Sequence, residues 1–340
     1  MKPVIQSNFN LKSVNTFGIE SFAKEFVTID SEEAIQQLID DAQLINKERL
    51  MLGGGSNLLF TKNFDGIVVK NNIKGIELLA ENDDHVFVQV GAGENWHQFV
   101  LHCIKNGWYG LENLSLIPGN VGASPMQNIG AYGVEIKDVF HELEAVQLRT
   151  GAVHYFDNAS CEFGYRESVF KKEMKNQYLI SNVTYKLAKQ PNFNIEYGAI
   201  KQELEKKNTA ELTAKAVSDA VIAIRSSKLP DPKVLGNAGS FFKNPVVENS
   251  LVEEVKQKYP NVVAYDIGGG QSKLAAGWLI EQAGWKGKQV GNCGVHHLQA
   301  LVLVNHGNAL GKEVYDLSSE ILASVKEKFG VELEREVNIY

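Results

Sequence analysis

Cysteine and long apolar runs are both scarce in this sequence. Cys103, Cys161 and Cys293 lie far apart in 340 residues and form no C-x-x-C pair, so the pattern indicates neither a disulfide framework nor a cysteine zinc site. The longest apolar stretches, such as LQALVLV at 298–304, are much shorter than the ~20 residues that a membrane-spanning helix needs. We therefore expect no transmembrane segment.

The first residues, MKPVIQSNFNLKSVNTFG, lack the basic stretch and continuous apolar core of a secretory signal. Together with the unpaired cysteines, this predicts a cytoplasmic location. The 34 basic residues are outnumbered by 41 acidic ones, and the resulting net charge of −7 would repel a polyanion. We therefore do not expect nucleic acid as a partner.

Metal-binding patterns are missing as well. The sequence has no H-E-x-x-H motif, paired C-x-x-C or EF-hand loop, so we expect no catalytic metal. The apolar fraction of 44% and the charged fraction of 22% are those of an ordinary folded chain. A chain of this length is long enough for about two to three domains.

Helical and strand periodicities alternate along the chain and predict mixed α and β structure. Apolar residues at helical spacing predict a helix over 31–47 with Asp30 as its cap. Strict alternation predicts strands over 85–90 and over the closing segment 331–340. The polar stretch 201–212 indicates a surface insertion or a domain junction.

Glycines mark the expected ends of several elements. Gly107 follows an apolar helical stripe that begins at Trp96, while Gly284 and Gly330 follow two later helical patterns. Gly151 lies between two strand patterns and predicts a hairpin turn.

Three consecutive glycines at 53–55 directly follow a predicted strand. Such a run lets backbone N–H groups converge on a phosphate without side chains in the way. A tight turn without a ligand is the alternative, and short glycine motifs do not separate the two. The run is neither a Walker loop nor the G-x-G-x-x-G of a Rossmann fold.

A second glycine-rich loop, at 117–133, is almost free of charged residues. Ordering so long a segment costs conformational entropy, which a bound group can offset. A flat aromatic ring, bonded by the backbone and by Ser124, Gln127 and Asn128, would serve, and a purely structural Ω-loop is the alternative. With the first loop, it predicts a large nucleotide cofactor that has a pyrophosphate and a ring.

Later segments supply candidates for chemistry. Ser240 has no G-x-S-x-G context and no histidine base in the sequence pattern, which favours a proton donor or a ligand group over an esterase nucleophile. Arg166 beside Tyr165 could grip a carboxylate bidentately, although an arginine on a surface strand is usually solvated. Glu336 shares its face with two other glutamates, as a solvated strand edge would.

Taken in order, these segments resemble the UDP-N-acetylenolpyruvoylglucosamine reductases, flavoenzymes of bacterial cell-wall precursor synthesis. The resemblance spans nearly the whole chain and belongs to the longer subtype. The matching motifs are NTFG at 15–18, LGGGSNLL at 52–59, PGNVGASPMQNIGAYG at 118–133, FGYRES at 163–168, SKLPDP at 227–232, GNAGSFFKNP at 236–245, KLAAGWLI at 273–280 and LEREV at 333–337.

The resemblance implies an α+β fold with a two-part FAD-binding region of the vanillyl-alcohol oxidase-like type and a C-terminal α+β substrate domain. The boundaries we expect are 1–72 joined by 330–340, then 73–212, then 213–329. By resemblance, noncovalent FAD would be held by Gly53, Gly54, Gly55, Ser56, Asn57, Ile117, Pro118, Gly119, Gly122, Ala123, Ser124, Gln127, Asn128, Gly130, Ala131 and Gly133.

The implied reaction has two half-reactions. NADPH reduces FAD, and hydride then passes to the enolpyruvyl ether of UDP-N-acetylglucosamine enolpyruvate to give UDP-N-acetylmuramate. Arg166 and Glu336 match the pair that stabilises developing charge, and Ser240 matches the proton donor. Positions that match substrate-binding residues are Tyr165, Tyr197, Lys228, Asn244, Tyr265, Lys273 and Gln299.

One departure and two alternatives accompany this interpretation. Many family members have arginine where this chain has Asn338. An FAD-dependent alcohol or sugar oxidase of the same superfamily is one alternative, and a nucleotide-sugar binding module without catalysis is the other. We also expect a monomer that binds neither nucleic acid nor a membrane.

Overall fold

The computed structural model describes residues 2–44, 47–206 and 211–340, which form two compact units. Unit 1 comprises the described residues of 1–9, 23–54 and 65–227, and unit 2 comprises 10–22, 55–64 and 228–340. The three-part division at 72 and 212 stays a prediction, and 207–210 of the expected surface insertion lie outside the described residues. Over the described ranges, no helix is long and apolar enough to cross a membrane.

The first sheet of unit 1 is covered by helix α1 (Glu32–Asp40). Ile35 and Leu38 of α1 share a buried cluster with strand residues such as Val27 and Ile67. The strands of this sheet, in spatial order, are β1 (Gln6–Asn10), β2 (Phe22–Ile29), β5 (Phe64–Asn71) and β3 (Arg49–Leu52).

Helix α1 is shorter than the sequence predicts, and its cap is a different residue. The Ser31 hydroxyl accepts the Ala34 N–H, so Ser31 rather than Asp30 is the cap. The helix ends at Asp40, and Ala42 has a left-handed φ of 54° that an α-helix cannot continue through. Residues 45–46 of the predicted helix lie outside the described residues.

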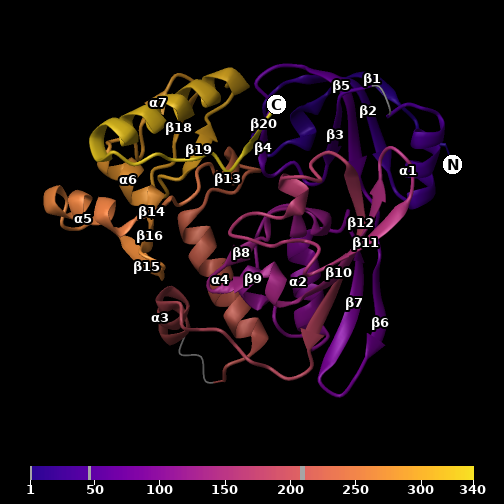
Figure 1. Ribbon diagram of the computed structural model, residues 1–340, viewed down its shortest axis with the longest axis horizontal. Coiled ribbons are helices and arrows are strands. Elements are labelled where there is room, and N and C mark those ends of the chain that lie inside the picture. Colours follow the sequence, from indigo (N-terminus) through magenta and orange to yellow (C-terminus); the bar gives the residue numbers. More distant parts are fainter. Residues whose placement is uncertain (1, 45–46, 207–210) are drawn as a thin grey trace. The chain divides into compact units, whose positions relative to one another are not determined.

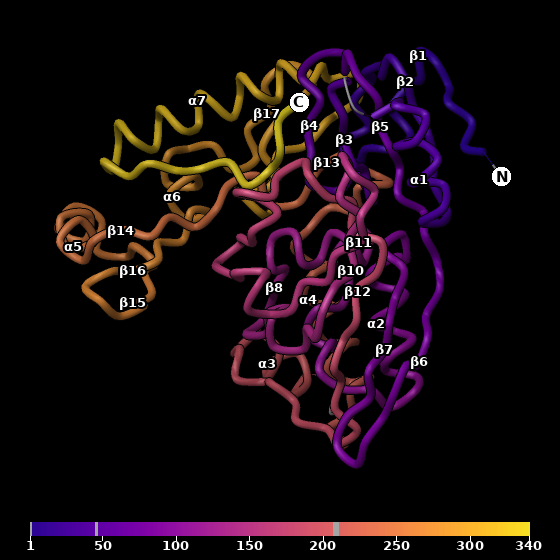
Figure 2. Tube along the Cα trace, turned by 45° about the vertical axis from the view of Figure 1, so that its right-hand side comes forward, coloured from indigo at the N-terminus to yellow at the C-terminus, as the bar shows by residue number. Residues whose placement is uncertain are grey.

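The second sheet of unit 1 is antiparallel. Its strands β6 (Ile76–Glu81) and β7 (His85–Gly91) form an elongated hairpin, which is labelled in Figure 2. Helix α2 (Trp96–Lys105) packs on it, because the buried rings of Trp96 and Phe99 contact Tyr185. The predicted strand at 85–90 and the turn at Gly151 are confirmed. The strands, in order, are β11 (Val153–Asp157), β10 (Phe140–Gln147), β12 (Tyr178–Ala188), β7 (His85–Gly91) and β6 (Ile76–Glu81).

Two helices and a short ladder complete unit 1. Helix α3 (Gly198–Lys206) and helix α4 (Ala214–Lys228) form one apolar cluster, in which Ile200 and Val221 are fully buried. Strand β8 (Gly130–Ala131) pairs with β9 (Val134–Glu135) inside the second glycine-rich loop and its continuation.

Unit 2 contains two antiparallel sheets and the helices α5 (Asn249–Lys258), α6 (Ala276–Gln282) and α7 (Gly311–Phe329) (Figure 1). Its core includes Phe241, Leu279 and Ile321. Gly284 and Gly330 follow α6 and α7 with positive φ, as the sequence predicts. The strands are β13 (Gly236–Ser240), β19 (Val302–Asn305), β18 (Cys293–Val295) and β17 (Gln289–Val290), and then β14 (Val246–Glu248), β16 (Gln271–Leu274) and β15 (Ala264–Gly268).

The closing segment is less regular than the strand predicted over 331–340. Strand β20 (Asn338–Ile339) pairs in parallel with β4 (Leu58–Leu59), and Arg335 forms an isolated bridge with Phe242. The alternation itself is present, because Val331 and Val337 are buried while Glu332 is exposed. The segment changes its backbone partner from Phe242 to Leu58 within three residues, so no continuous ladder forms.

Candidate active site

The two glycine-rich loops meet backbone to backbone in unit 1. A Cβ atom added to Gly54 would lie 2.8 Å from the Gly119 Cα and 3.0 Å from the Asn120 Oδ1. No side chain larger than hydrogen fits there without moving the second loop. Both glycines nevertheless stay partly exposed, so a phosphate could approach their main chain without a Cβ in the way. In this respect the residues present fit a dinucleotide cofactor.

The first loop continues into unit 2, where its second half is anchored. Gly55 has φ +66°, and a Cβ there would collide with the Val14 carbonyl oxygen. The Gly55 carbonyl accepts the Thr16 N–H at 3.0 Å. The Asn57 carbonyl accepts both the backbone N–H and the side-chain amide of Asn338, at 3.2 and 2.9 Å. Asn338, the departure from the family pattern, thus helps to fix this loop.

Side chains of the second loop maintain its own shape. The Ser124 hydroxyl is hydrogen-bonded to the Tyr185 hydroxyl at 2.7 Å, and Asn128 donates to the Gly164 carbonyl at 3.1 Å. Both residues are buried. Both side chains therefore have hydrogen-bond partners within the protein. Their contact with a cofactor ring, like that of Gln127 and the backbone of 117–133, stays a prediction.

Arg166 lies against this loop. Its Nη2 donates to the Gly130 carbonyl at 2.7 Å, and its guanidinium lies 5.8 Å from the centre of the Tyr165 ring. Arg166 itself has a φ of 57°, which is unusual for a residue with a side chain. Backbone strain of this kind concentrates at functional sites, and it aims the arginine at the loop.

Arg225 is a site residue that the sequence analysis did not select. Its Nε donates to the Leu116 carbonyl at 3.2 Å, and its guanidinium is hydrogen-bonded to the Tyr132 hydroxyl. Burial lowers the pKa of Arg225, and the positive charge of Arg166 lowers it further. Arg225 follows Val221 by four residues, which places a charge on the buried stripe of α4. A charged residue at a buried helix position was therefore the signal in the sequence that could have identified Arg225.

Tyr197 belongs to the same cluster in unit 1. Its ring meets that of Tyr132 edge to face, with centres 5.2 Å apart, and it is 51% exposed. Tyr132 in turn contacts Arg225. The cluster therefore combines two guanidinium groups with an exposed aromatic ring.

Ser240 and Glu336 approach each other in unit 2. The Glu336 N–H donates at 2.8 Å to the carbonyl of Phe241, the residue after Ser240. The Asn57 side chain reaches the Glu336 carbonyl at 3.5 Å. Glu336 is less exposed than Glu332 and Glu334, so it differs from the solvated edge that its sequence pattern indicates.

The remaining predicted substrate residues lie in several elements of unit 2. Tyr265 and Lys273 are directly opposite in the β15–β16 ladder, and Tyr265 is 59% exposed. Asn244 accepts the N–H of Ala276 at the start of α6, at 2.9 Å. Gln299 accepts the Leu301 N–H at 3.3 Å. Lys228 is exposed; it is the last residue of α4, and the last segment of unit 2 begins with it. Within the described ranges, no three His, Cys, Asp or Glu residues are grouped so that they could hold a metal ion.

Known families match both parts of the chain. Residues 23–157 match an FAD binding domain, and residues 231–340 match the C-terminal domain of UDP-N-acetylenolpyruvoylglucosamine reductase. The reductase of Flavobacterium johnsoniae is 52% identical over 336 residues, which are 98% of this chain and 99% of that protein. The Pseudomonas putida reductase is 50% identical over 335 residues, 98% of each chain.

Solved structures agree on the fold. A reductase of this name from Thermus caldophilus has a TM-score of 0.67 at 24% identity and covers 100% of this chain and 99% of its own. The 4-ethylphenol oxidase of Gulosibacter chungangensis has a TM-score of 0.53 at 12% identity, over 98% and 86%. The predicted α+β fold with a vanillyl-alcohol oxidase-like FAD region is thereby confirmed.

These matches also confirm that the protein is an FAD-dependent oxidoreductase. The junction of the glycine loops lies inside the matched FAD-binding domain. Arg166 and Arg225 lie in the segment between the two matched domains. On identity at this level over nearly its full length, the chain belongs to the UDP-N-acetylenolpyruvoylglucosamine reductase family.

Proposed function

We propose that this protein reduces the enolpyruvyl ether of UDP-N-acetylglucosamine enolpyruvate to UDP-N-acetylmuramate, a step of peptidoglycan precursor synthesis, with NADPH as the reductant. The observation that carries the proposal is the pair Arg166 and Arg225 beside the second loop. Burial lowers the pKa of Arg225, whose hydrogen bonds go to the neutral groups of Leu116 and Tyr132. A partly buried positive site of this kind is stabilised by an anion, and the substrate brings a carboxylate and a diphosphate.

When bound at the glycine loops, FAD would supply the hydride transfer between NADPH and the terminal vinyl carbon of the substrate. The protein's task at that moment is electrostatic. Negative charge develops on the neighbouring carbon and its carboxylate, and a preorganised guanidinium stabilises such charge. Arg166 fits this role, since its side chain is fixed by the Gly130 carbonyl and by the turn around it.

The reaction ends with a proton transfer to the carbon that bears the carboxylate. We assign this proton to the Ser240 hydroxyl. A serine is a weak acid, but the carbanion-like carbon is a stronger base than the alkoxide that remains. Glu336 is next to the end of the same strand, because its N–H donates to the Phe241 carbonyl. We assign to it, together with Arg166, the stabilisation of the developing charge. The added hydride and the added proton together convert the CH2=C group to CH3–CH.

The cysteines argue against the oxidase alternative with a thiol-linked flavin. Burial raises the pKa of Cys161 to about 12 and that of Cys293 to about 11, and it raises the pKa of Cys103 as well. A thiol that stays protonated is a poor nucleophile. All three are free, which suits the reducing cytoplasm in which we propose that the enzyme works.

A visible spectrum of the purified protein tests the proposal. We expect flavin bands, release of all flavin on denaturation, bleaching by anaerobic NADPH and full return of colour when the enolpyruvyl substrate is added. Bleaching by an alcohol or sugar but not by NADPH would favour the oxidase. A colourless protein that binds UDP-sugars would favour a binding module.

A further inference from the structure

The strand that ends at Ser240 contains one residue too many. In the ladder of β13 with β19, Asn237 lies opposite Val304, but Ser240 lies opposite Val302. Three steps along β13 thus match two steps along β19, which defines a β-bulge. Because side chains alternate between the faces of a strand, the extra residue decides which face the Ser240 side chain occupies.

Gly239 lies at the bulge with φ +69°. Beyond its two chain neighbours, nothing in the described part of the chain lies within 4 Å of a Cβ added there, so no steric clash demands glycine at this position. The Asn237 side chain holds the local backbone, because its Oδ1 accepts the Gly239 N–H at 2.9 Å. An asparagine that bonds the backbone two residues ahead closes a local turn and holds the bulge in place.

The Asn237 amide is itself held in one orientation. Its Nδ2 donates to the carbonyls of Leu235 and Pro230, at 2.8 and 3.2 Å. Turning the amide over would place its oxygen against these two carbonyls and its nitrogen against the Gly239 N–H, so the reverse orientation is excluded. The side chain is 4% exposed, and all its hydrogen-bonding groups are used.

Backbone bonds fix both ends of the short segment around Ser240. The Asn237 N–H donates to the Thr16 carbonyl at 3.1 Å, and the Phe241 N–H donates to the Leu301 carbonyl at 2.8 Å. Between these two anchors, the bulge sets the direction of the Ser240 hydroxyl. A proton donor must lie within hydrogen-bond reach of the carbon it serves, and an error of 1 Å can cost about 100-fold in rate.

We propose that Asn237 is the positioning residue for the Ser240 hydroxyl, through its hold on the Gly239 bulge. This inference rests on the proposed function, in which Ser240 supplies the proton. Asn237 acts through the backbone and does not contact the substrate. Its effect therefore belongs to the half-reaction that consumes the proton and not to the one that consumes NADPH.

The test compares Asn237→Ala with Asn237→Ser in the flavin-loaded enzyme by stopped-flow spectroscopy. The serine hydroxyl can still accept the Gly239 N–H, whereas alanine cannot. For Asn237→Ala we expect flavin reduction by NADPH within twofold of wild type and reoxidation by the enolpyruvyl substrate slowed 10- to 100-fold, with KM little changed. Asn237→Ser should recover a large part of the lost rate. Amide hydrogen exchange over 236–242 should accelerate in Asn237→Ala and less so in Asn237→Ser.

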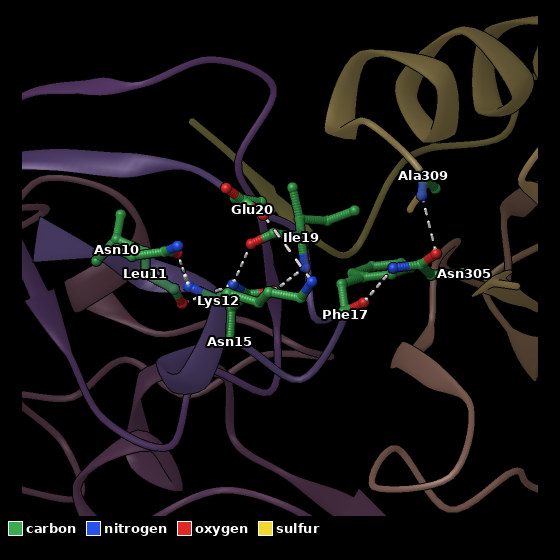
Figure 3. Close-up of polar contacts among 9 residues, drawn as sticks. All are labelled: Asn10, Leu11, Lys12, Asn15, Phe17, Ile19, Glu20, Asn305 and Ala309. Carbon is green, nitrogen blue, oxygen red and sulfur yellow. Dashed lines mark hydrogen bonds and ion pairs between the residues drawn. The ribbon is translucent and has the colours of Figure 1, made fainter. Parts of the chain in front are cut away.

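Asn305 provides a matched control in the neighbouring strand (Figure 3). Its buried amide donates to the Phe17 carbonyl at 2.9 Å and accepts the N–H groups of Gly307 and Ala309, at 2.8 and 3.1 Å. Asn305 pairs with Gly236 in the ladder, so Asn305→Ala removes an equivalent set of bonds next to the bulge while the Asn237–Gly239 hydrogen bond stays in place. It should lower Tm and leave both half-reactions within twofold of wild type.

A double-mutant cycle separates positioning from general damage. If Asn237 acts through Ser240, Asn237→Ala should add little to the defect of Ser240→Ala. Additive defects, or equal slowing of both half-reactions, would overturn the inference while the proposed function stands. If Ser240→Ala itself leaves reoxidation intact, the proton-donor assignment is rejected and the positioning role falls with it. Should Asn237→Ala fail to fold, Gly239→Ala disturbs the same bulge without a steric clash, and it must show the same selective defect.

Discussion

The Thr16 hydroxyl donates a 2.6 Å hydrogen bond to the carbonyl of Asn237, a residue 221 positions away in the sequence. The Thr16 N–H bonds the Gly55 carbonyl at 3.0 Å. One residue thus joins the first glycine loop to the strand of Ser240 within unit 2. The neighbouring Asn15 amide bonds the carbonyls of Leu11 and Ile19 and shapes the turn that presents Thr16 (Figure 3). The NTFG motif therefore has a structural explanation.

Replacing Thr16 by valine should destabilise unit 2. The side chain keeps its volume, but the buried Asn237 carbonyl loses its hydroxyl donor, which costs about 1–3 kcal/mol. We expect a lower Tm for Thr16→Val than for wild type, and a Tm near wild type for Thr16→Ser, which keeps the hydroxyl. Equal Tm values for the two variants would show that the hydrogen bond is unimportant.

The glycine junction predicts contrasting effects at adjacent positions. Gly54→Ala brings a Cβ to 2.8 Å from the Gly119 Cα, whereas a Cβ at Gly53 would meet Asn120 at 3.8 Å, an ordinary contact. Gly54→Ala should lower both the Tm of the flavin-free protein and the flavin retained after purification, while Gly53→Ala keeps the Tm. Loss of flavin without loss of Tm in Gly53→Ala would instead indicate direct contact with the cofactor. Similar Tm losses in both variants would contradict the junction.

Arg166→Ala should reduce kcat by about two to three powers of ten, the effect of removing one preorganised donor from a developing charge. Steady-state kinetics with the enolpyruvyl substrate measures it. Arg149→Ala removes the same charge from an exposed position in the turn after β10 and should leave kcat unchanged. A change in KM alone for Arg166→Ala would make Arg166 a binding residue rather than a catalytic one.

Ser240→Ala should separate the two half-reactions. Because the hydroxyl is needed only for the final proton, NADPH should still bleach the flavin at the wild-type rate. Reoxidation by the enolpyruvyl substrate should fall at least 100-fold. Anaerobic stopped-flow measurement follows both steps at the flavin band. Loss of both steps together would mean that Ser240 supports the site as a whole.

A glutamate pair in unit 1 predicts a pH-dependent stability. Burial, followed by the nearby Glu32, raises the pKa of Glu144 from 4.5 to about 7. The folded state therefore keeps a proton that the unfolded state loses near pH 4.5, and stability falls as the pH rises through 7. Glu144→Gln removes this penalty. Allowing for solvent screening of a half-buried group, it should exceed wild type by ~1 kcal/mol at pH 8 and match it near pH 4.5. If the free energies of unfolding of wild type and Glu144→Gln differ by the same amount at every pH in this range, the raised pKa of Glu144 is contradicted.

Local patterns in the sequence predicted much of the secondary structure. Strand β7, helix α2 and the turns at Gly107 and Gly151 follow from periodicity and glycine placement, which depend on neighbours in the chain. The end of α1 was wrong because the apolar spacing continues beyond Asp40, whereas the backbone at Ala42 turns left-handed. Periodicity does not report that conformation.

The residues of the site likewise fall into two groups: those that local sequence identifies and those that depend on tertiary packing. The glycine loops and Ser240 stand out by composition, and the resemblance assigns their roles. The sequence analysis did not identify Arg225 and Asn237, because tertiary packing sets their partners. Leu116 lies 109 residues from Arg225, and the Asn237 carbonyl accepts a hydrogen bond from Thr16. The internal bonds of Ser124 were equally hidden, because a polar residue in a loop gives no sign of whether it faces a ligand or a neighbouring strand.

Unit 2 is assembled from 10–22, 55–64 and 228–340. During synthesis, its two early pieces must therefore wait for more than 160 intervening residues of unit 1 (65–227) before their partners exist. Closing such long loops slows folding and leaves apolar side chains such as Phe17 uncovered meanwhile. A C-terminal fragment that begins at residue 228 would contain Ser240 but lack Thr16, whose hydroxyl bonds the strand of Ser240. Excised pieces of this protein should accordingly aggregate where the full chain folds.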